Sequence, residues 1–201
     1  NYEPTHIAIA FDLPGGVFRN EIYPEYKANR EETPDDIKMS IPYIRRIIEG
    51  FRIPILEMAG FEADDVVGTI AKIAEKEGFD VFMVTPDKDY GQLVTEHVKM
   101  LKPGRQGNPN EILGVKEICE KFGIERTEQV IDILGLQGDS VDNIPGVPWV
   151  GPKTAMTLIA DYGSVDGVIA HSHEFKGKLK ERVEENTEQA EPSKELSTVN
   201  R

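Results

Sequence analysis

Short apolar runs alternate with longer segments of helical periodicity over the first half of the chain. Runs of strand length lie at residues 6–11 (HIAIAF), 53–58 (IPILEM) and 80–85 (DVFMVT). Between them, residues 35–51 and 62–76 repeat apolar side chains at the three- and four-residue spacing of an amphipathic helix. This order of strands and helices predicts an α/β unit with a mainly parallel sheet.

Two details of these helices can be predicted from their residues. Pro42 falls inside the first helix and is expected to kink or split it, because proline lacks the N–H that the helix needs. In the second helix, Asp64 or Asp65 is expected at the N-terminus. The buried stripe of that helix is then expected to consist of Val66, Val67, Ile70, Ile73 and Ala74.

The pattern changes near residue 105, within a Gly-, Pro- and Asn-rich loop at residues 101–112. The segments that follow have helical patterns and lie at residues 114–123, 126–138, 151–163, 164–172 and 176–190. We therefore predict two parts, an α/β core over residues 1–105 and a helical subdomain over residues 106–201.

The formal net charge of −13 argues, taken alone, against binding to a polyanion such as DNA. Bound divalent cations would remove that objection if the acids cluster. The single cysteine excludes an internal disulfide and fits a reducing cytosol. No window has the roughly 18 apolar residues of a membrane span, and no signal-peptide pattern is present, so we expect a cytoplasmic protein. Because the chain starts at Asn1 rather than Met, we expect a fragment.

Acidic residues follow each predicted strand. Asp12 follows the first, the group from Glu62 to Asp65 follows the second, and Asp87 with Asp89 follows the third. Because the carboxyl ends of parallel strands meet at one edge of a sheet, these acids should converge. Carboxylates suit Mg²⁺ or Mn²⁺, and two such ions can bracket a phosphodiester for hydrolysis. The alternative for any single Asp is a helix cap, but one cap needs only one acid.

A Gly- and Pro-rich hairpin marks the second half, within GDSVDNIPGVPWVGPKTA at residues 138–155. Asp139 and Asp142 precede it at a spacing that puts both on one face of a helical turn. Pro152 suits the first turn of the next helix, whose N–H groups can bind a phosphate with help from Lys153 and Thr154. The alternative is an ordinary helix–turn–helix connection.

The segment YKANR brings basic and aromatic residues close to the acids in sequence. Lys27 and Arg30 could bind a reacting phosphate and offset negative charge. Tyr26 could stack on a base. The alternatives are a solvated basic turn and a tyrosine that packs on the surface. The sequence contains no Ser–His–Asp arrangement, Walker motif or cysteine pair.

Three motifs, FEADDVVGT, VTPDKDYGQLV and LQGDSVDNIPGVPWVGPKTA, resemble in this order the 5′→3′ exonuclease domain of bacterial DNA polymerase I, a member of the flap endonuclease family. The stretch FRNEIYPEYKANREETPDD is similar to the part of that family leading into its arch over the threaded strand. The resemblance covers essentially the whole chain. It implies a PIN-like core over residues 1–105, with the arch segment at about 24–50. It also implies a helical DNA-binding subdomain over residues 106–201, with a helix-hairpin-helix (helix-3-turn-helix) at 139–160.

The resemblance further implies an activity and its residues. The activity is two-metal hydrolysis of phosphodiesters at 5′ ends and flaps, in primer removal and DNA repair, by the exonuclease part of a DNA polymerase. The implied ligands of two Mg²⁺ (or Mn²⁺) ions are Asp12, Glu62, Asp64, Asp65, Asp87, Asp89, Asp139 and Asp142. Lys27 and Arg30 match catalytic cations at the scissile phosphate. The implied DNA contacts are Tyr26, Lys27, Arg30, Gly146, Val147, Gly151, Lys153 and Thr154, and K⁺ can assist at the hairpin.

The partners implied are 5′-flap, nicked and RNA-primed duplex DNA. The resemblance also implies a polymerase region after residue 201, in a monomeric, nucleoid-associated bacterial protein without membrane contact. The chain departs from the family in two places. The family begins with an Asp-bearing strand and a helix upstream of HIAIAFD, so we expect the sheet and the metal site each to lack one member. Trp149 stands where the family has a small residue. A non-catalytic duplex-binding module and a metal-dependent phosphatase are the alternative functions.

Overall fold

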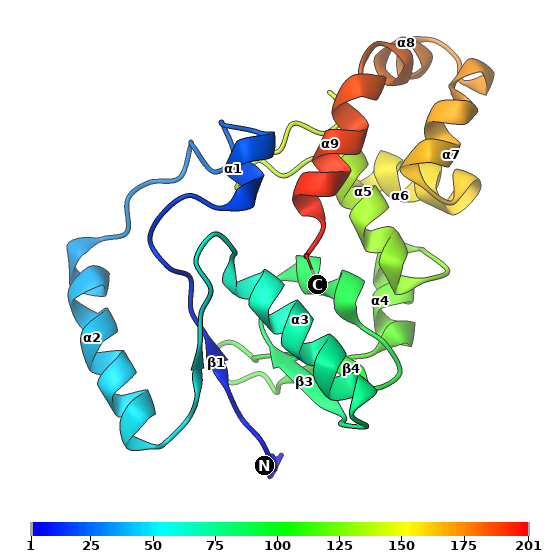
Figure 1. Cartoon of the computed structure of the whole chain (residues 1–201). Helices are drawn as coiled ribbons and strands as arrows, with labels where there is room; N and C mark the ends of the chain where they lie inside the picture. The colour runs from blue at the N-terminus through cyan, green and yellow to red at the C-terminus, as the bar shows by residue number, and fades with distance from the viewer. Residues whose placement is uncertain (1, 201) are drawn as a thin grey trace.

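The first half of the molecule alternates short strands with helices. The computed structural model describes residues 2–200 (Figure 1). The elements of this half are β1 (Ile9–Ala10), α1 (Phe18–Ile22), α2 (Asp35–Gly50), β2 (Ile55–Leu56), α3 (Ala63–Lys76), β3 (Val81–Val84), the 3₁₀ helix η1 (Lys88–Leu93), β4 (Val98–Lys102) and β5 (Glu111–Leu113).

Between residues 2 and 200 the strands form two small sheets. β1 pairs in parallel with β2, with Ile9 opposite Ile55, and β3 pairs in parallel with β4, with Val81 opposite Val98. β5 adds to β4 in the antiparallel direction. α3 packs against both β1 and β3 and thereby joins the two sheets. The predicted α/β architecture with mainly parallel pairing is confirmed. β1 and β2 are shorter than their apolar runs because their pairing ladder ends after two residues.

The second half is helical. Its elements are α4 (Val115–Phe122), η2 (Thr127–Gln129), α5 (Val130–Gln137), α6 (Pro152–Tyr162), α7 (Val165–Ala170), η3 (Ser172–Glu174), α8 (Lys178–Glu185) and α9 (Thr187–Ser197). α5 is the central helix and packs against α6, α7 and α9, with Val130 and Ile133 fully buried. Figure 1 shows α9 running back toward α3, where the N–H of Asn200 donates to Asp65. No helix between residues 2 and 200 is long and apolar enough to cross a membrane.

Two local features differ from expectation. α2 is not split but runs as one helix of 16 residues through Pro42, which is exposed, so water can satisfy the carbonyl that loses its partner. In α3, Ile70 and Ile73 are exposed rather than buried. The helix instead turns Gly68 inward, where a Cβ would lie 2.7 Å from Val199 Cγ1. Close packing of Gly68 against Val199 therefore sets the orientation of α3. The spacing of apolar residues in the helix cannot predict this contact, because Val199 is distant in the sequence.

α9 approaches α5 so closely at Gly135 that no side chain fits there. A Cβ at Gly135 would lie 2.7 Å from Lys194 Cβ and 3.0 Å from Lys194 Cα. We predict that Gly135→Ala lowers the free energy of unfolding by about 1–2 kcal/mol, since overpacking outweighs the gain in helix propensity. Urea unfolding measures this difference. Gly50→Ala, whose Cβ would meet nothing within 4 Å, is the control and should be neutral or stabilising. A Gly135→Ala protein as stable as its parent would contradict the close packing.

Candidate metal centre and nucleic-acid interface

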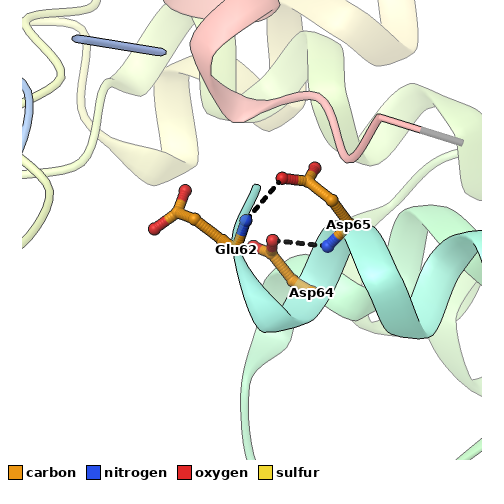
Figure 2. Close-up of side chains that lie close together, drawn as sticks. All are labelled: Glu62, Asp64 and Asp65. Atoms are coloured by element: carbon orange, nitrogen blue, oxygen red, sulfur yellow. Dashed lines mark hydrogen bonds between the residues drawn. The ribbon is translucent and has the colours of Figure 1, made fainter. Parts of the chain in front are cut away.

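Acidic side chains crowd at the N-terminus of α3. Glu62 is the N-cap, and Asp64 and Asp65 occupy the first turn, where the helix dipole favours negative charge. The N–H of Glu62 donates to Asp65 Oδ2 at 3.1 Å, and the N–H of Asp65 donates to Asp64 Oδ1 at 2.7 Å (Figure 2). One carboxylate oxygen of each residue lies within 4.8 Å of the other two. Asp12 Oδ1 accepts the N–H of Ala63 at 2.7 Å, which places a fourth acid at the same helix end.

A buried arginine from α1 supports this group. Arg19 is 1% exposed, and its guanidinium donates to Glu62 Oε2 at 2.9 Å and to both oxygens of Asp65 at 2.8 Å. It also donates to the carbonyl oxygens of Leu196 and Thr198. Although burial disfavours the charge, the hydrogen bond and attraction of Asp65 keep the pKa of Arg19 above its ordinary value. No sequence pattern marks Arg19, because its acceptors lie between 43 and 179 residues away.

The segment that begins at Tyr26 bridges this group to another acid. The Tyr26 hydroxyl donates to Glu62 Oε2 at 2.8 Å and lies 3.4 Å from Asp142 Oδ2. Burial, followed by the charge of Glu62, raises the pKa of Tyr26, so the hydroxyl remains a donor. Lys27 pairs with Glu62 and lies 3.6 Å from Asp142, with which Arg30 pairs. Tyr26, predicted from sequence to stack on a base, is buried against carboxylates, and its ring is not available for stacking.

A second acidic group surrounds η1. Asp87 caps η1 by accepting the N–H of Asp89 at 3.0 Å, and Lys88 Nζ lies 3.2 Å from Asp139 Oδ2. Asp89 Oδ1 is buried and has no hydrogen-bond partner among residues 2–200. Burial, and then the charge of Asp87, raises the pKa of Asp89 to about 7, with Lys88 opposing. A buried carboxylate oxygen without a donor suits a metal ligand.

The hydroxyl of Tyr90 is influenced by acids of both groups, which the sequence does not reveal. Burial raises the pKa of its hydroxyl, and the charges of Asp64, Asp87, Asp12 and Asp65 raise it further. These carboxylates come from three separate segments, so the fold brings them together near one hydroxyl. Burial also raises the pKa of Asp64 to about 6. The acids that follow the three predicted strands thus meet in one region.

The hairpin before α6 depends on two glycines in close contact. A Cβ at Gly146 would lie 2.3 Å from the backbone N of Gly138, and both residues have positive φ, so glycine is required. Two residues predicted to contact DNA instead form hydrogen bonds within the protein. The N–H of Gly146 donates to a serine hydroxyl of α9, and Val147 is buried and donates its N–H to α5. The predicted hairpin contacts that remain accessible are Gly151, Lys153 and the half-buried Thr154.

Family models and relatives match the chain over nearly its whole length. One model, described as "5'-3' exonuclease, N-terminal resolvase-like domain", matches residues 1–123, and another, "5'-3' exonuclease, C-terminal SAM fold", matches residues 125–201. DNA polymerase I of Bacillus caldotenax is 40% identical over 200 residues, which are 99% of this chain and 23% of that protein. A 5'-3' exonuclease of Aquifex aeolicus is 37% identical over 185 residues, 92% of this chain and 62% of that protein. The chain therefore spans less than two thirds of both relatives.

Solved structures share the fold. T5 5'-exonuclease with bound zinc has a TM-score of 0.84 at 24% identity, over 98% of this chain and 75% of that one. The catalytic core of Rad2 in complex with a DNA substrate has a TM-score of 0.54 at 20% identity, over 90% of this chain and 58% of that one. The predicted PIN-like core followed by a helical second half is confirmed.

Removal of the Arg19 guanidinium should be costly to the fold. We predict that Arg19→Gln lowers the free energy of unfolding by about 3–5 kcal/mol, because Glu62 and Asp65 are left buried without their positive partner. Urea unfolding in EDTA measures the loss. The control, Arg45→Gln, removes a partly exposed pair with Glu57 and a contact with the Phe11 ring, and should lower the free energy of unfolding by no more than about 1 kcal/mol. Equal stability of the two variants would contradict the role given to Arg19.

The raised pKa of Asp89 predicts a pH dependence. Its folded-state pKa of about 7 lies above the ordinary value of 3.8, so the folded metal-free protein holds a proton that the unfolded chain releases. The contribution of Asp89 to stability should therefore fall as pH rises from about 4 through about 7. In EDTA, Asp89→Asn should be more stable than the parent at pH 8, and the difference should shrink toward pH 4.

Urea unfolding at a series of pH values measures this difference. Asp161→Asn, which alters an exposed acid on α6, is the control and should show no such trend. A destabilised Asp89→Asn protein at pH 8, or a difference that does not change with pH, would contradict the burial of a repelled carboxylate at this position.

Proposed function

The chain belongs to the 5′-3′ exonuclease family, and from this premise we propose that it hydrolyses phosphodiester bonds at the 5′ ends and 5′ flaps of DNA in a metal-dependent reaction. The observation that supports this most is the buried oxygen of Asp89, which has no donor among residues 2–200 and lies among like charges. Asp87, Asp139 and Asp142 all raise the pKa of this carboxyl by repulsion. Hard cations with oxygen ligands would relieve that repulsion.

Two divalent ions, Mg²⁺ or Mn²⁺, fit the donor set. The residues that would hold them are Asp12, Glu62, Asp64, Asp65, Asp87, Asp89, Asp139 and Asp142. When bound, such ions lower the pKa of water and neutralise charge on the phosphate. Because Glu62 and Asp65 already accept from Arg19, we propose that Asp64 is the principal ligand of the α3 group. Glu62 and Asp65 then serve chiefly to hold that helix end in place.

Lys27 and Arg30 would bind the reacting phosphate. Their side chains are 23% and 48% exposed and are paired with Glu62 and Asp142, so each can exchange a carboxylate for a phosphate oxygen. Lys27 has a φ of 58°, and its N–H donates to Asp142 O at 2.9 Å. This turn holds both cations at the edge of the acidic region, where they would stabilise charge that develops on the phosphate.

The start of α6 would hold the duplex part of the substrate. Gly151, Lys153 and Thr154 offer backbone N–H groups, a cation and a hydroxyl at a helix N-terminus. Gly146 and Val147 would support this surface from inside, and K⁺ at the hairpin stays a prediction. T5 flap endonuclease and Rad2, which share the fold, were solved in complex with DNA, which supports DNA as a partner, and the duplex and flap forms stay predictions. By relation to DNA polymerase I, we also propose a polymerase region in the parent chain and roles in primer removal and repair.

Cleavage of a labelled 5′-flap duplex tests the proposal. We predict metal-dependent cleavage near the junction that Asp89→Asn lowers by about 100-fold or more, because it removes a ligand, while duplex binding persists. The exposed Asp80→Asn change is the matched control and should cleave normally. The assay uses Mg²⁺ or Mn²⁺, with EDTA as the blank, on this chain and on the longer parent protein.

Other outcomes would replace the proposal. Duplex binding in EDTA without cleavage by either protein would favour a non-catalytic DNA-binding module. Release of inorganic phosphate from small esters, without cleavage of the flap, would favour a phosphatase. Normal flap cleavage by Asp89→Asn would remove Asp89 from the metal site.

A further inference from the structure

Trp149, the sole tryptophan of the chain, projects from the hairpin that precedes α6. It is 82% exposed, although burial of an indole is strongly favourable. Its backbone has a φ of 67°, in the left-handed region that bulky side chains avoid and glycine adopts readily. A large aromatic residue is therefore held at the surface in a strained conformation.

The folding of the hairpin relies on the neighbours of Trp149. Val147 and Val150 are buried, and the N–H of Val150 donates to Val147 O at 3.0 Å, which closes the turn around the tryptophan. Glycine at position 149 would adopt the same backbone geometry without strain. Strain that is retained at an exposed position suggests a role in binding rather than in the fold.

One cation lies against the indole ring, in a protein whose net charge is −13. The guanidinium carbon of Arg182, on α8, lies 5.6 Å from the centre of the Trp149 ring, so one ring face is covered by a cation. Lys153 is exposed in the first turn of α6, and Lys176 and Lys178 are exposed shortly before Arg182 in the chain. An exposed aromatic ring beside a guanidinium suits a polyanion that also offers flat apolar surfaces, which nucleic acid does.

We propose that Trp149 and Arg182 form a duplex-contacting pair. The open face of the indole packs on a deoxyribose or base of the bound DNA, and Arg182 contacts the adjacent phosphate. The proposal rests on the proposed function and deepens it, because it extends the duplex surface from the start of α6 to α8.

Tryptophan fluorescence tests the pair directly, since the signal comes from one residue. The chain is titrated with a short blunt-ended DNA duplex, with Ca²⁺ in place of Mg²⁺ to slow hydrolysis. Anisotropy of a dye on the DNA reports binding independently. We expect the emission of Trp149 to be quenched along the same binding curve. Trp149→Gly should weaken duplex affinity roughly tenfold and unfold at the same or a higher temperature, whereas Trp149→Tyr should retain most of the affinity.

Phe79→Ser is the matched control, because Phe79 is an exposed aromatic residue in the α/β half, and its duplex affinity should equal that of the parent. Duplex binding without quenching, and with full affinity in Trp149→Gly, would overturn the proposal and leave the proposed function intact. A lower unfolding temperature for Trp149→Gly would make Trp149 a structural residue. Equal quenching by polyglutamate would indicate an acidic peptide partner. Absence of any DNA binding would overturn both the pair and the proposed function.

Discussion

The buried guanidinium of Arg19 is the interaction on which the rest of the site depends. It joins α1, the first turn of α3 and the end of α9 through hydrogen bonds to Asp65, Glu62 and two backbone carbonyls. Buried charges of this kind are tolerated only when each is paired and hydrogen-bonded, and the multidentate contact meets that condition. Because both carboxylates are held by the same group, the N-terminus of α3 has a fixed position relative to the C-terminal segment.

The acids that Arg19 does not pair with remain under-compensated. Asp64 and Asp89 have pKa values raised to about 6 and about 7, because both are partly buried near like charges. Lys27 contacts Glu62 and Asp142, and Lys88 contacts Asp139, so these lysines neutralise only part of the charge. The repulsion between these acids lowers the stability of the metal-free fold. Bound hard cations would remove that repulsion. A site that lowers stability in this way is expected where the residues are needed for function.

How far the sequence could predict this molecule depends on the range of each interaction. Apolar runs and acids after strands are local signals, and they predict the α/β order and the segments that carry the acids. Arg19 carries no local signal, since its partners are distant in sequence. The hydroxyl of Tyr26 donates a hydrogen bond to Glu62, which is 36 residues away. Tyr26 is therefore buried, although the sequence predicted that it could stack on a base. Gly68 sets the orientation of α3 by packing against Val199, which periodicity cannot report.

Anomalous diffraction from crystals soaked in Mn²⁺ tests most directly whether these acids crowd because cations lie between them. We expect two peaks, one within coordination distance of the Asp64 carboxylate and one within coordination distance of Asp89 Oδ1, the buried oxygen without a donor among residues 2–200. At Mn²⁺ concentrations that saturate cleavage, the absence of peaks at these acids, or peaks only at exposed carboxylates elsewhere, would contradict the metal centre.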